Sequence, residues 1–151
     1  MLRLYRICRN IYEPNDATGA SRTPGRRHVL GQKVLYYCSS LAMCVLELRA
    51  NSVSFAAIRR EYHYVDIEFD TKRFEVMEVP ESFYSKNWTL NRKLTQKYGS
   101  EWFKTGKYSI LKVYGAVLPT DSNFILNVAH PDFLKLKFPK PMKIPLDSRI
   151  N

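Results

Sequence analysis

Five short segments of the chain carry the apolar patterns that are typical of β-strands. Residues 2–8 set Leu2 and Leu4 among basic residues, and residues 62–69 alternate through Val65, Ile67 and Phe69. Alternation with a period of two predicts a strand that buries one face. Three further apolar runs have the character of short strands, at residues 34–37, 110–118 and 124–126. The pattern therefore predicts a sheet built from strands that are spread along the chain.

Two longer segments are predicted to be helices. The first covers residues 41–49 and follows Ser39 or Ser40, either of which suits an N-cap. Its apolar face consists of Leu41, Val45 and Leu48. The second covers residues 91–105 and is expected to be interrupted near Gly99, because glycine weakens a helix interior.

Polar and proline-rich segments separate these elements. Residues 14–25 are predicted to form a long polar loop, and four prolines are expected to break up an extended tail after residue 130. The elements show no regular βαβ rhythm and no internal repeat. They therefore indicate a mixed α+β fold, as a single compact domain over residues 1–151.

The composition adds a strong positive charge to this picture. The 151 residues include 24 lysines and arginines against 14 aspartates and glutamates, which gives a formal net charge of +10. This balance suits an anionic cofactor, an acidic protein partner or nucleic acid, and it also suits ordinary solubility. No helix-turn-helix, zinc-finger or RNP pattern accompanies the basic residues, so direct nucleic-acid binding is the least favoured of these partners.

The cysteines and the hydropathy pattern indicate the compartment. Cys8, Cys38 and Cys44 form neither a CxxC motif nor a Cys/His cluster, which argues against a disulfide framework and a structural zinc site. No run of about 18 apolar residues is present, and the first residues lack the apolar stretch of a signal peptide. We therefore expect a cytoplasmic protein with no metal and no membrane contact.

One segment concentrates residues that carry chemistry. Between Pro24 and Glu47 lie two adjacent arginines, a histidine, two glycines, two tyrosines and a glutamate on an otherwise apolar helix. Arginines suit bidentate recognition of phosphate, and glycines allow close backbone approach. Ser40, Cys44 and Glu47 share one helical stripe. The residues alone indicate an anion-binding loop beside a carboxylate, and a solvated helix glutamate is the alternative for Glu47.

An ordered set of short blocks resembles the RES-domain family from one end of the chain to the other. Early blocks are Leu4-Tyr5-Arg6-Ile7, Gly25-Arg26-Arg27-His28 with Gly31, Val34-Leu35-Tyr36, and Ser40-Leu41-Ala42 through Leu46-Glu47. Later blocks are Val113 through Pro119, Asn123-Phe124-Ile125-Leu126-Asn127, His130-Pro131-Asp132-Phe133, and Leu146 through Ile150. No single block is specific, but their order is. The resemblance implies an ADP-ribosyltransferase-like fold with a twisted, mainly antiparallel sheet and a few helices.

The resemblance also implies an activity and roles for individual residues. RES domains are toxins that consume NAD⁺ or transfer ADP-ribose, so NAD⁺ is the implied substrate. Glu47 would be the catalytic carboxylate, helped by Tyr36 at the nicotinamide–ribose end and by Arg26. The implied NAD⁺-binding set consists of Arg6, Arg26, Tyr36, His28, Ser40 and Asn123. Breaking the nicotinamide–ribose bond develops positive charge on the ribose, which a carboxylate stabilises, while guanidinium groups offset the pyrophosphate charge.

Several of these residues also have a purely structural interpretation. Arg6 could face solvent on its strand, and Arg26 could cap a turn. Tyr36 could be a core residue with its hydroxyl tied to the backbone, while His28 could order the loop. Ser40 suits an N-cap better than a ligand.

The resemblance further implies partners. The toxin would belong to a type II toxin–antitoxin pair and be neutralised by an Xre-type antitoxin. A homodimer within that complex and a protein target of ADP-ribosylation are both left open. The acceptor of the ADP-ribosyl group also stays open between water, phosphate and a protein.

Two departures from the family pattern keep rival functions in view. Gly115 stands where the family has a serine, and Arg27 stands where it has a tryptophan. The loss of that hydroxyl favours a first alternative, a catalytically weakened domain that only binds its antitoxin. A second alternative is a basic RNA-targeting toxin, suggested by the charge and by the chain's three histidines, His28, His63 and His130.

Overall fold

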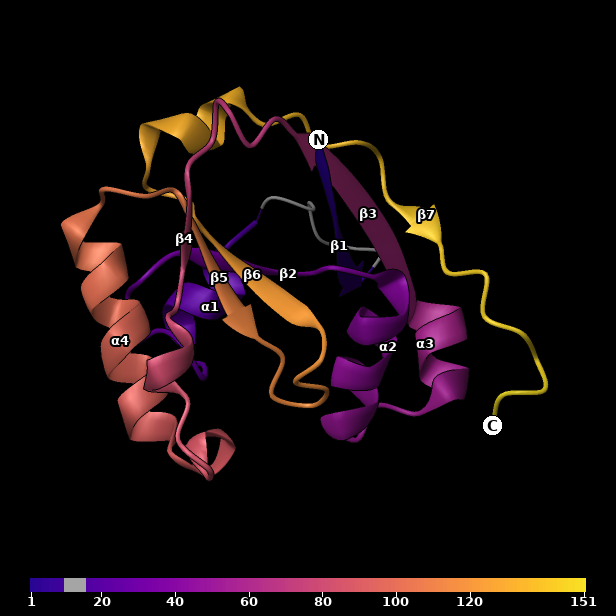
Figure 1. Ribbon diagram of the computed structural model, residues 1–151. Coiled ribbons are helices and arrows are strands. Elements are labelled where there is room, and N and C mark those ends of the chain that lie inside the picture. The colour runs from indigo at the N-terminus through magenta and orange to yellow at the C-terminus, as the bar shows by residue number, and fades with distance from the viewer. Residues whose placement is uncertain (10–15) are drawn as a thin grey trace.

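In the computed structural model, which describes residues 1–9 and 16–151, one sheet of seven strands dominates the fold (Figure 1). The strand order is β4-β5-β6-β2-β1-β3-β7, and every neighbouring pair is antiparallel except β4 and β5. The strands are β1 (Leu2–Arg9), β2 (Val34–Cys38), β3 (Tyr62–Phe69), β4 (Val76–Glu78), β5 (Ile110–Tyr114), β6 (Ser122–Asn127) and β7 (Met142–Lys143). The expected α+β fold with a mainly antiparallel sheet is confirmed.

The two longest helices cover one face of this sheet from two sides. The α-helices are α1 (Thr18–Arg22), α2 (Leu41–Ala50), α3 (Phe55–Glu61) and α4 (Arg92–Thr105), and the 3-10 helices are η1 (Glu81–Phe83), η2 (Trp88–Leu90) and η3 (Pro131–Lys135). Trp102 of α4 packs with Val34, whereas Met43 of α2 packs with Cys38. Val34 and Cys38 point to the same side of β2, because side chains alternate along a strand. Thus α2 and α4 cover the same face, with β2 between them (Figure 1).

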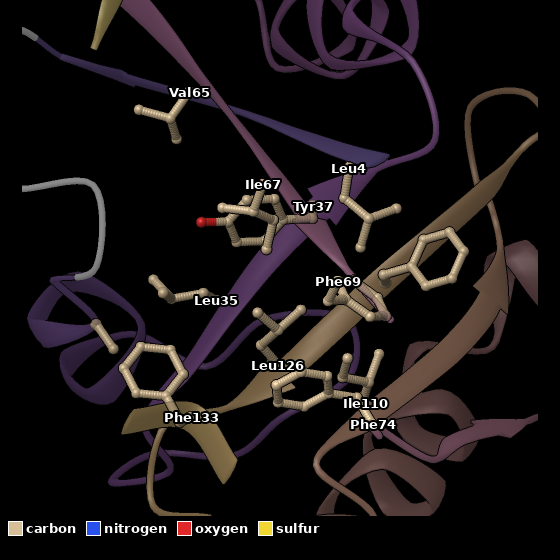
Figure 2. Close-up of a cluster of buried hydrophobic side chains, with 12 residues drawn as sticks. Leu4, Leu35, Tyr37, Val65, Ile67, Phe69, Phe74, Ile110, Leu126 and Phe133 are labelled. Carbon is tan, nitrogen blue, oxygen red and sulfur yellow. The ribbon is translucent and has the colours of Figure 1, made fainter. Parts of the chain in front are cut away.

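The opposite face of the sheet carries the largest apolar cluster, which Figure 2 shows. Phe133 of η3 packs over this face, and Tyr37 lies in the cluster with no exposed surface. Its members are Leu4, Ala17, Leu35, Tyr37, Val65, Ile67, Phe69, Phe74, Ile110, Phe124, Leu126 and Phe133. Burial of each large apolar side chain contributes about 1.5–3 kcal/mol, so this cluster holds the central strands together.

Most of the elements expected from the sequence are confirmed. Strands occupy the segments expected at residues 2–8, 34–37, 62–69 and 124–126. Helix α2 begins where expected, and the Ser40 side chain accepts a hydrogen bond from the Met43 amide at 3.1 Å as its N-cap. No helix among residues 1–9 and 16–151 is long and apolar enough to cross a membrane.

Other expectations are corrected. The strand expected to reach residue 118 ends at Tyr114, because the Gly115 amide donates to the Asp121 carbonyl at 2.9 Å and closes a turn. The short helix α1 interrupts the expected polar loop, of which Pro14 and Asn15 lie outside the described residues. Helix α3 and strand β4 were not anticipated, because both are short and lack clear periodicity.

Helix α4 runs through Gly99 without the expected break. Gly99 is buried, and a Cβ atom placed on it would lie 1.8 Å from the carbonyl oxygen of Arg27. Glycine is therefore required here by a close approach between helix and loop and does not mark a break in the helix. The contact brings α4 against the arginine-containing segment.

Replacing Gly99 with alanine should destabilise the protein, although alanine has the higher helix propensity. The added methyl group must displace the Arg27 backbone, and overpacking of this kind typically costs about 1–3 kcal/mol. Gly19→Ala is the matched control, because Gly19 is also helical and a Cβ there meets nothing within 4 Å. Thermal unfolding of both variants provides the test. Equal effects of the two substitutions would show that the Gly99 contact does not constrain the fold.

Candidate functional site

Strands β1 and β2 are paired through their backbones at only one residue pair. Tyr5 pairs with Cys38, whereas the other edge of β1 pairs with β3 over its whole length. Beyond that pair, Nη1 of Arg6 donates to the Tyr36 carbonyl oxygen at 3.4 Å. A guanidinium thus takes the place of regular backbone pairing, and the sheet opens in its middle.

One cavity lies at this opening, and a second adjoins it over β2, β5 and β6. The larger, of about 270 Å³, is named here the Arg6 cavity, and the smaller, of about 80 Å³, is named the Arg27 cavity. Both are lined by Tyr36, Glu47 and Asn123. The Arg6 cavity adds Arg6, Ile7, Tyr37, Cys38, Cys44, Leu48 and Asn51, and the Arg27 cavity adds Arg26, Arg27, Val113, Tyr114 and Ala116. Five residues predicted for the site thus line one divided cavity: Arg6, Arg26, Tyr36, Glu47 and Asn123.

Helix α2 presents Glu47 to both cavities. The helix is fixed to β1 by the Cys44 thiol, which donates to the Tyr5 carbonyl at 3.2 Å. One turn later, Oε1 of Glu47 accepts a hydrogen bond from Nδ2 of Asn123 on β6 at 2.9 Å. Glu47 is half-buried, and its partner Asn123 is a neutral donor that does not offset a negative charge.

Tyr36 is tied to the arginine loop by a chain of hydrogen bonds. Nε2 of His28 lies 2.8 Å from the Ala20 carbonyl oxygen and 2.9 Å from that of Thr23, so Nε2 carries a proton. In the neutral ring Nδ1 then accepts from the Tyr36 hydroxyl at 2.6 Å. The same hydroxyl oxygen accepts from the Arg27 amide at 3.3 Å. The hydroxyl therefore positions the loop, and the ring lines the cavities.

The surroundings of Tyr36 shift the pKa of its hydroxyl. Burial raises the pKa of Tyr36 to about 12, although the hydrogen bond from the Arg27 amide works in the opposite direction. The phenol is therefore neutral near neutral pH and does not act as a general base there.

Helix α4 holds the backbone of the arginine loop, residues 24–27. Three of its side chains bind successive loop carbonyls: Arg92 to Pro24 at 2.8 Å, Gln96 to Gly25 at 2.6 Å, and Thr95 to Arg26 at 2.8 Å. Gly99 follows against the Arg27 carbonyl. The loop is thus fixed residue by residue, which limits the loss of entropy when it binds a ligand.

The sequence pattern does not identify Arg27 as a site residue, but the structure places it at the cavities. Its side chain is 3% exposed and lies over the Trp88 ring, with 5.3 Å from the guanidinium carbon to the ring centroid. The guanidinium forms no ion pair among the described residues, and the Tyr84 side chain is its polar neighbour. One signal was available in the sequence: the related family has a large aromatic residue at this position, and such a position is typically buried.

Two predicted residues lie outside both cavity linings. His28 is buried beneath the loop and ordered by Tyr36, and Ser40 caps α2. Within residues 1–9 and 16–151, no group of three or more histidines, cysteines or carboxylates could hold a metal ion.

The chain is similar to a well-defined group of known proteins. The family model for the RES domain matches residues 3–147. A protein named Toxin Res from Photorhabdus laumondii is 27% identical over 150 residues, which cover 97% of this chain and 96% of that protein. A Prs ADP-ribosylating toxin from a Sphingobium species is 26% identical over 144 residues, with 92% and 89% covered.

A solved structure shares the fold. A chain in the crystal structure of the M. tuberculosis MbcT–MbcA toxin–antitoxin complex superposes with a TM-score of 0.67. The match covers 94% of this chain and 83% of the other, at 15% sequence identity. At that identity the likeness concerns the fold.

Two adjacent tyrosines allow a matched test of the hydrogen-bond chain. Tyr36→Phe leaves the His28 ring and the Arg27 amide without a partner, which should cost about 1–3 kcal/mol of stability. Tyr37→Phe should be neutral or stabilising, because the buried Tyr37 hydroxyl has no partner. Denaturant unfolding of both variants measures the difference. If Tyr37→Phe proves the more damaging change, the network described here is not the one that orders the loop.

Proposed function

The chain belongs to the RES domain family, and from this premise we propose that it is a toxin that breaks the nicotinamide–ribose bond of NAD⁺. In this proposal residues 1–151 work as one RES domain, and the reaction takes place at the divided cavity. The naming of relatives as Toxin Res and as an ADP-ribosylating toxin supports this activity.

One observation carries the proposal: unpaired buried polar atoms surround a single carboxylate. Nε of Arg6 and Oδ1 of Asn123 are buried without hydrogen-bond partners, and the buried guanidinium of Arg27 has no carboxylate partner among the described residues. All three residues line the cavities beside Glu47. Buried polar groups in native proteins are nearly always paired, so a cluster of unpaired ones favours a polar, charged ligand. An anionic dinucleotide that acquires positive charge on a ribose during reaction matches this arrangement.

Residues of both cavities have roles in breaking the nicotinamide–ribose bond. As the nicotinamide–ribose bond breaks, its electron pair leaves on nicotinamide, and the ribose takes on oxocarbenium character. Glu47 stabilises that positive charge, and Asn123 keeps the carboxylate in place. Arg6 binds a phosphate of the dinucleotide with its free Nε donor. Arg26 lines the other cavity, and Glu47 lines both.

The proposal extends to a partner and a compartment. A toxin that consumes NAD⁺ must be restrained by a cognate antitoxin, and the fold is shared with a chain of a toxin–antitoxin complex. We assign the partner to the Xre type and the compartment to the cytoplasm, where NAD⁺ is available. The acceptor is water, phosphate or a protein, and the product formed from NAD⁺ distinguishes the three.

A second candidate function is an antitoxin-binding domain that has lost its activity, favoured by Gly115. A Cβ atom at this position would lie 2.8 Å from the Leu118 carbonyl oxygen, so the family's serine does not fit the present turn without a backbone shift. Gly115 does not line either cavity, however, and the carboxylate and arginines are in place without it. The RNA-targeting alternative is less well supported, because His28 and His130 are both committed to structural hydrogen bonds.

Glu47→Gln should abolish NAD⁺ consumption and leave the fold nearly unchanged. The substitution keeps the shape of the side chain and removes the charge that stabilises the transition state, a loss of about 3–4 kcal/mol in the barrier and hundreds of times in rate. Glu75→Gln, an exposed glutamate far along the chain, is the matched control and should retain full activity. Nicotinamide release from NAD⁺ by the purified proteins measures both. Retention of more than about a tenth of the wild-type rate by Glu47→Gln would remove Glu47 from the catalytic role.

Arg26→Lys should weaken NAD⁺ binding although the charge is kept. Lysine offers a point charge on a flexible stem and lacks the planar fork of donors, so we expect about a tenfold rise in Kd. Lys137→Ala, a surface change in the basic tail, should have little effect. Calorimetric titration of NAD⁺ in a Glu47→Gln background avoids turnover. Equal losses for the two changes would mean that diffuse positive charge holds the ligand.

A further inference from the structure

Helix α4 has two different sides. One side holds the arginine loop through Arg92, Thr95 and Gln96. The other side lines a separate cavity of about 330 Å³, which shares no lining residue with the Arg6 cavity or the Arg27 cavity. The lining of this α4 cavity includes Met77, Tyr98, Glu101, Trp102, Lys107 and Tyr108. Its volume lies within the range of roughly 300–1,000 Å³ that is typical of ligand pockets.

The walls of the α4 cavity are mostly aromatic. Trp102 is 3% exposed, while Tyr98 and Tyr108 are half-buried. The Tyr98 ring makes an edge contact with Phe83, with 4.8 Å between the ring centroids, and is thereby held in place. Aromatic walls around a space of this size suit a flat ring, because rings attract one another through offset-stacked and edge-to-face contacts. The exposed Glu101 carboxylate, which only accepts hydrogen bonds, suits a ring that carries an amino group.

Exposed lysines follow the solvent-facing side of the same helix. Lys97 and Lys104 lie about one turn and about three turns after Lys93, so the three share one face. None of them forms an ion pair among the described residues. Lys97 and Lys104 are each about one turn from Glu101, so this lysine stripe borders the α4 cavity. Lys107 lines the cavity itself.

Positive charge beside an aromatic cavity is the arrangement that binds single-stranded nucleic acid. Lysines bind the phosphates whatever the sequence, and aromatic side chains stack on the bases. The stripe from Lys93 to Lys104 extends about 16 Å at about 1.5 Å per residue, which suits several successive phosphates better than one free nucleotide. In a duplex the bases are stacked inside, and one would have to be extruded to enter the cavity. An acidic peptide would use the lysines and leave the aromatic walls without a partner.

We propose that the α4 cavity and the lysine stripe form a binding site for single-stranded nucleic acid, separate from the divided cavity. One unstacked base enters the α4 cavity, packs against its aromatic walls and donates from its amino group to Glu101. The neighbouring phosphates bind Lys97, Lys104 and Lys107. The site gives a role to part of the net charge of +10 that the divided cavity does not use.

Fluorescence anisotropy of a labelled RNA of ten cytidines, titrated with the full chain at several salt concentrations, tests the lysine stripe. The double variant Lys97→Ala, Lys104→Ala should bind more weakly. Its plot of log K against log salt should be less steep by about 1.4, because each phosphate contact on a single strand contributes about 0.7. Lys72→Ala, Lys140→Ala removes the same charge from exposed positions elsewhere and should keep the wild-type slope. Equal changes in the two double variants would mean that diffuse charge holds the strand, and would overturn the proposal.

Tyr98→Leu tests whether a base occupies the cavity. Loss of stacking should raise the Kd for the RNA about tenfold at constant salt and leave the salt slope unchanged. Tyr64→Leu, at another half-buried tyrosine, is the matched control and should bind as the wild type does. An unaltered Kd in Tyr98→Leu, or equally tight binding of a duplex of the same length, would contradict the proposal. The two lysines are exposed, so their test stands even if Tyr98→Leu does not fold.

Competitors distinguish other occupants of the site. Unlabelled RNA should displace the labelled strand, whereas CMP at the same concentration should not, because it offers a single phosphate. Displacement by CMP as effective as that by RNA would assign the site to a free nucleotide. Equally effective displacement by polyglutamate would assign it to an acidic protein segment. Displacement by ADP-ribose would place the strand at the divided cavity. Each of these three results would overturn the proposal.

Discussion

The early parting of β1 from β2 is the constraint on which the site depends. A sheet that continued its pairing beyond Tyr5 and Cys38 would have no opening in its middle. Instead Arg6 binds the Tyr36 carbonyl with its side chain, and the Arg6 cavity lies where the strands separate, next to the Arg27 cavity. The extended pairing of β1 with β3 and of β2 with β6 holds each strand in the sheet while the two diverge. The opening is therefore part of the folded sheet and needs no movement to form.

Hydrogen bonds fix the charged side chains of the site from two sides, through α2 and through α4. On one side α2, fixed to β1, sets Glu47 against Asn123. On the other side α4 binds the loop carbonyls of residues 24–26, and Tyr36 and His28 hold the loop from below. Burying an unpaired cation is costly and persists only where the surroundings fix it, and such strained positions gather at functional sites. A ligand that supplies negative charge beside Arg27 would therefore stabilise the folded protein.

The sequence predicted the elements with strong periodicity and failed where tertiary contact decides. The long strands and α2 followed from alternation and from a serine N-cap, and Arg6, Tyr36 and Glu47 were placed together through the family blocks. Gly99 was misread as a helix break, because only the folded loop shows why its side chain must be absent. Arg27 is absent from the predicted site, since burial of a charged residue depends on neighbours more than 60 residues away in the chain, such as Trp88 and Gly99.

The products formed from NAD⁺ show directly whether the nicotinamide–ribose bond is the one that breaks. Purified protein is incubated with NAD⁺, and the products are separated by chromatography and identified by mass spectrometry over time. Cleavage at the nicotinamide–ribose bond should give nicotinamide together with an equal amount of ADP-ribose, free or attached to an acceptor. Nicotinamide mononucleotide together with AMP would place the cleavage at the pyrophosphate and contradict the role given to Glu47. Intact NAD⁺ in the presence of folded protein would contradict the proposed activity altogether.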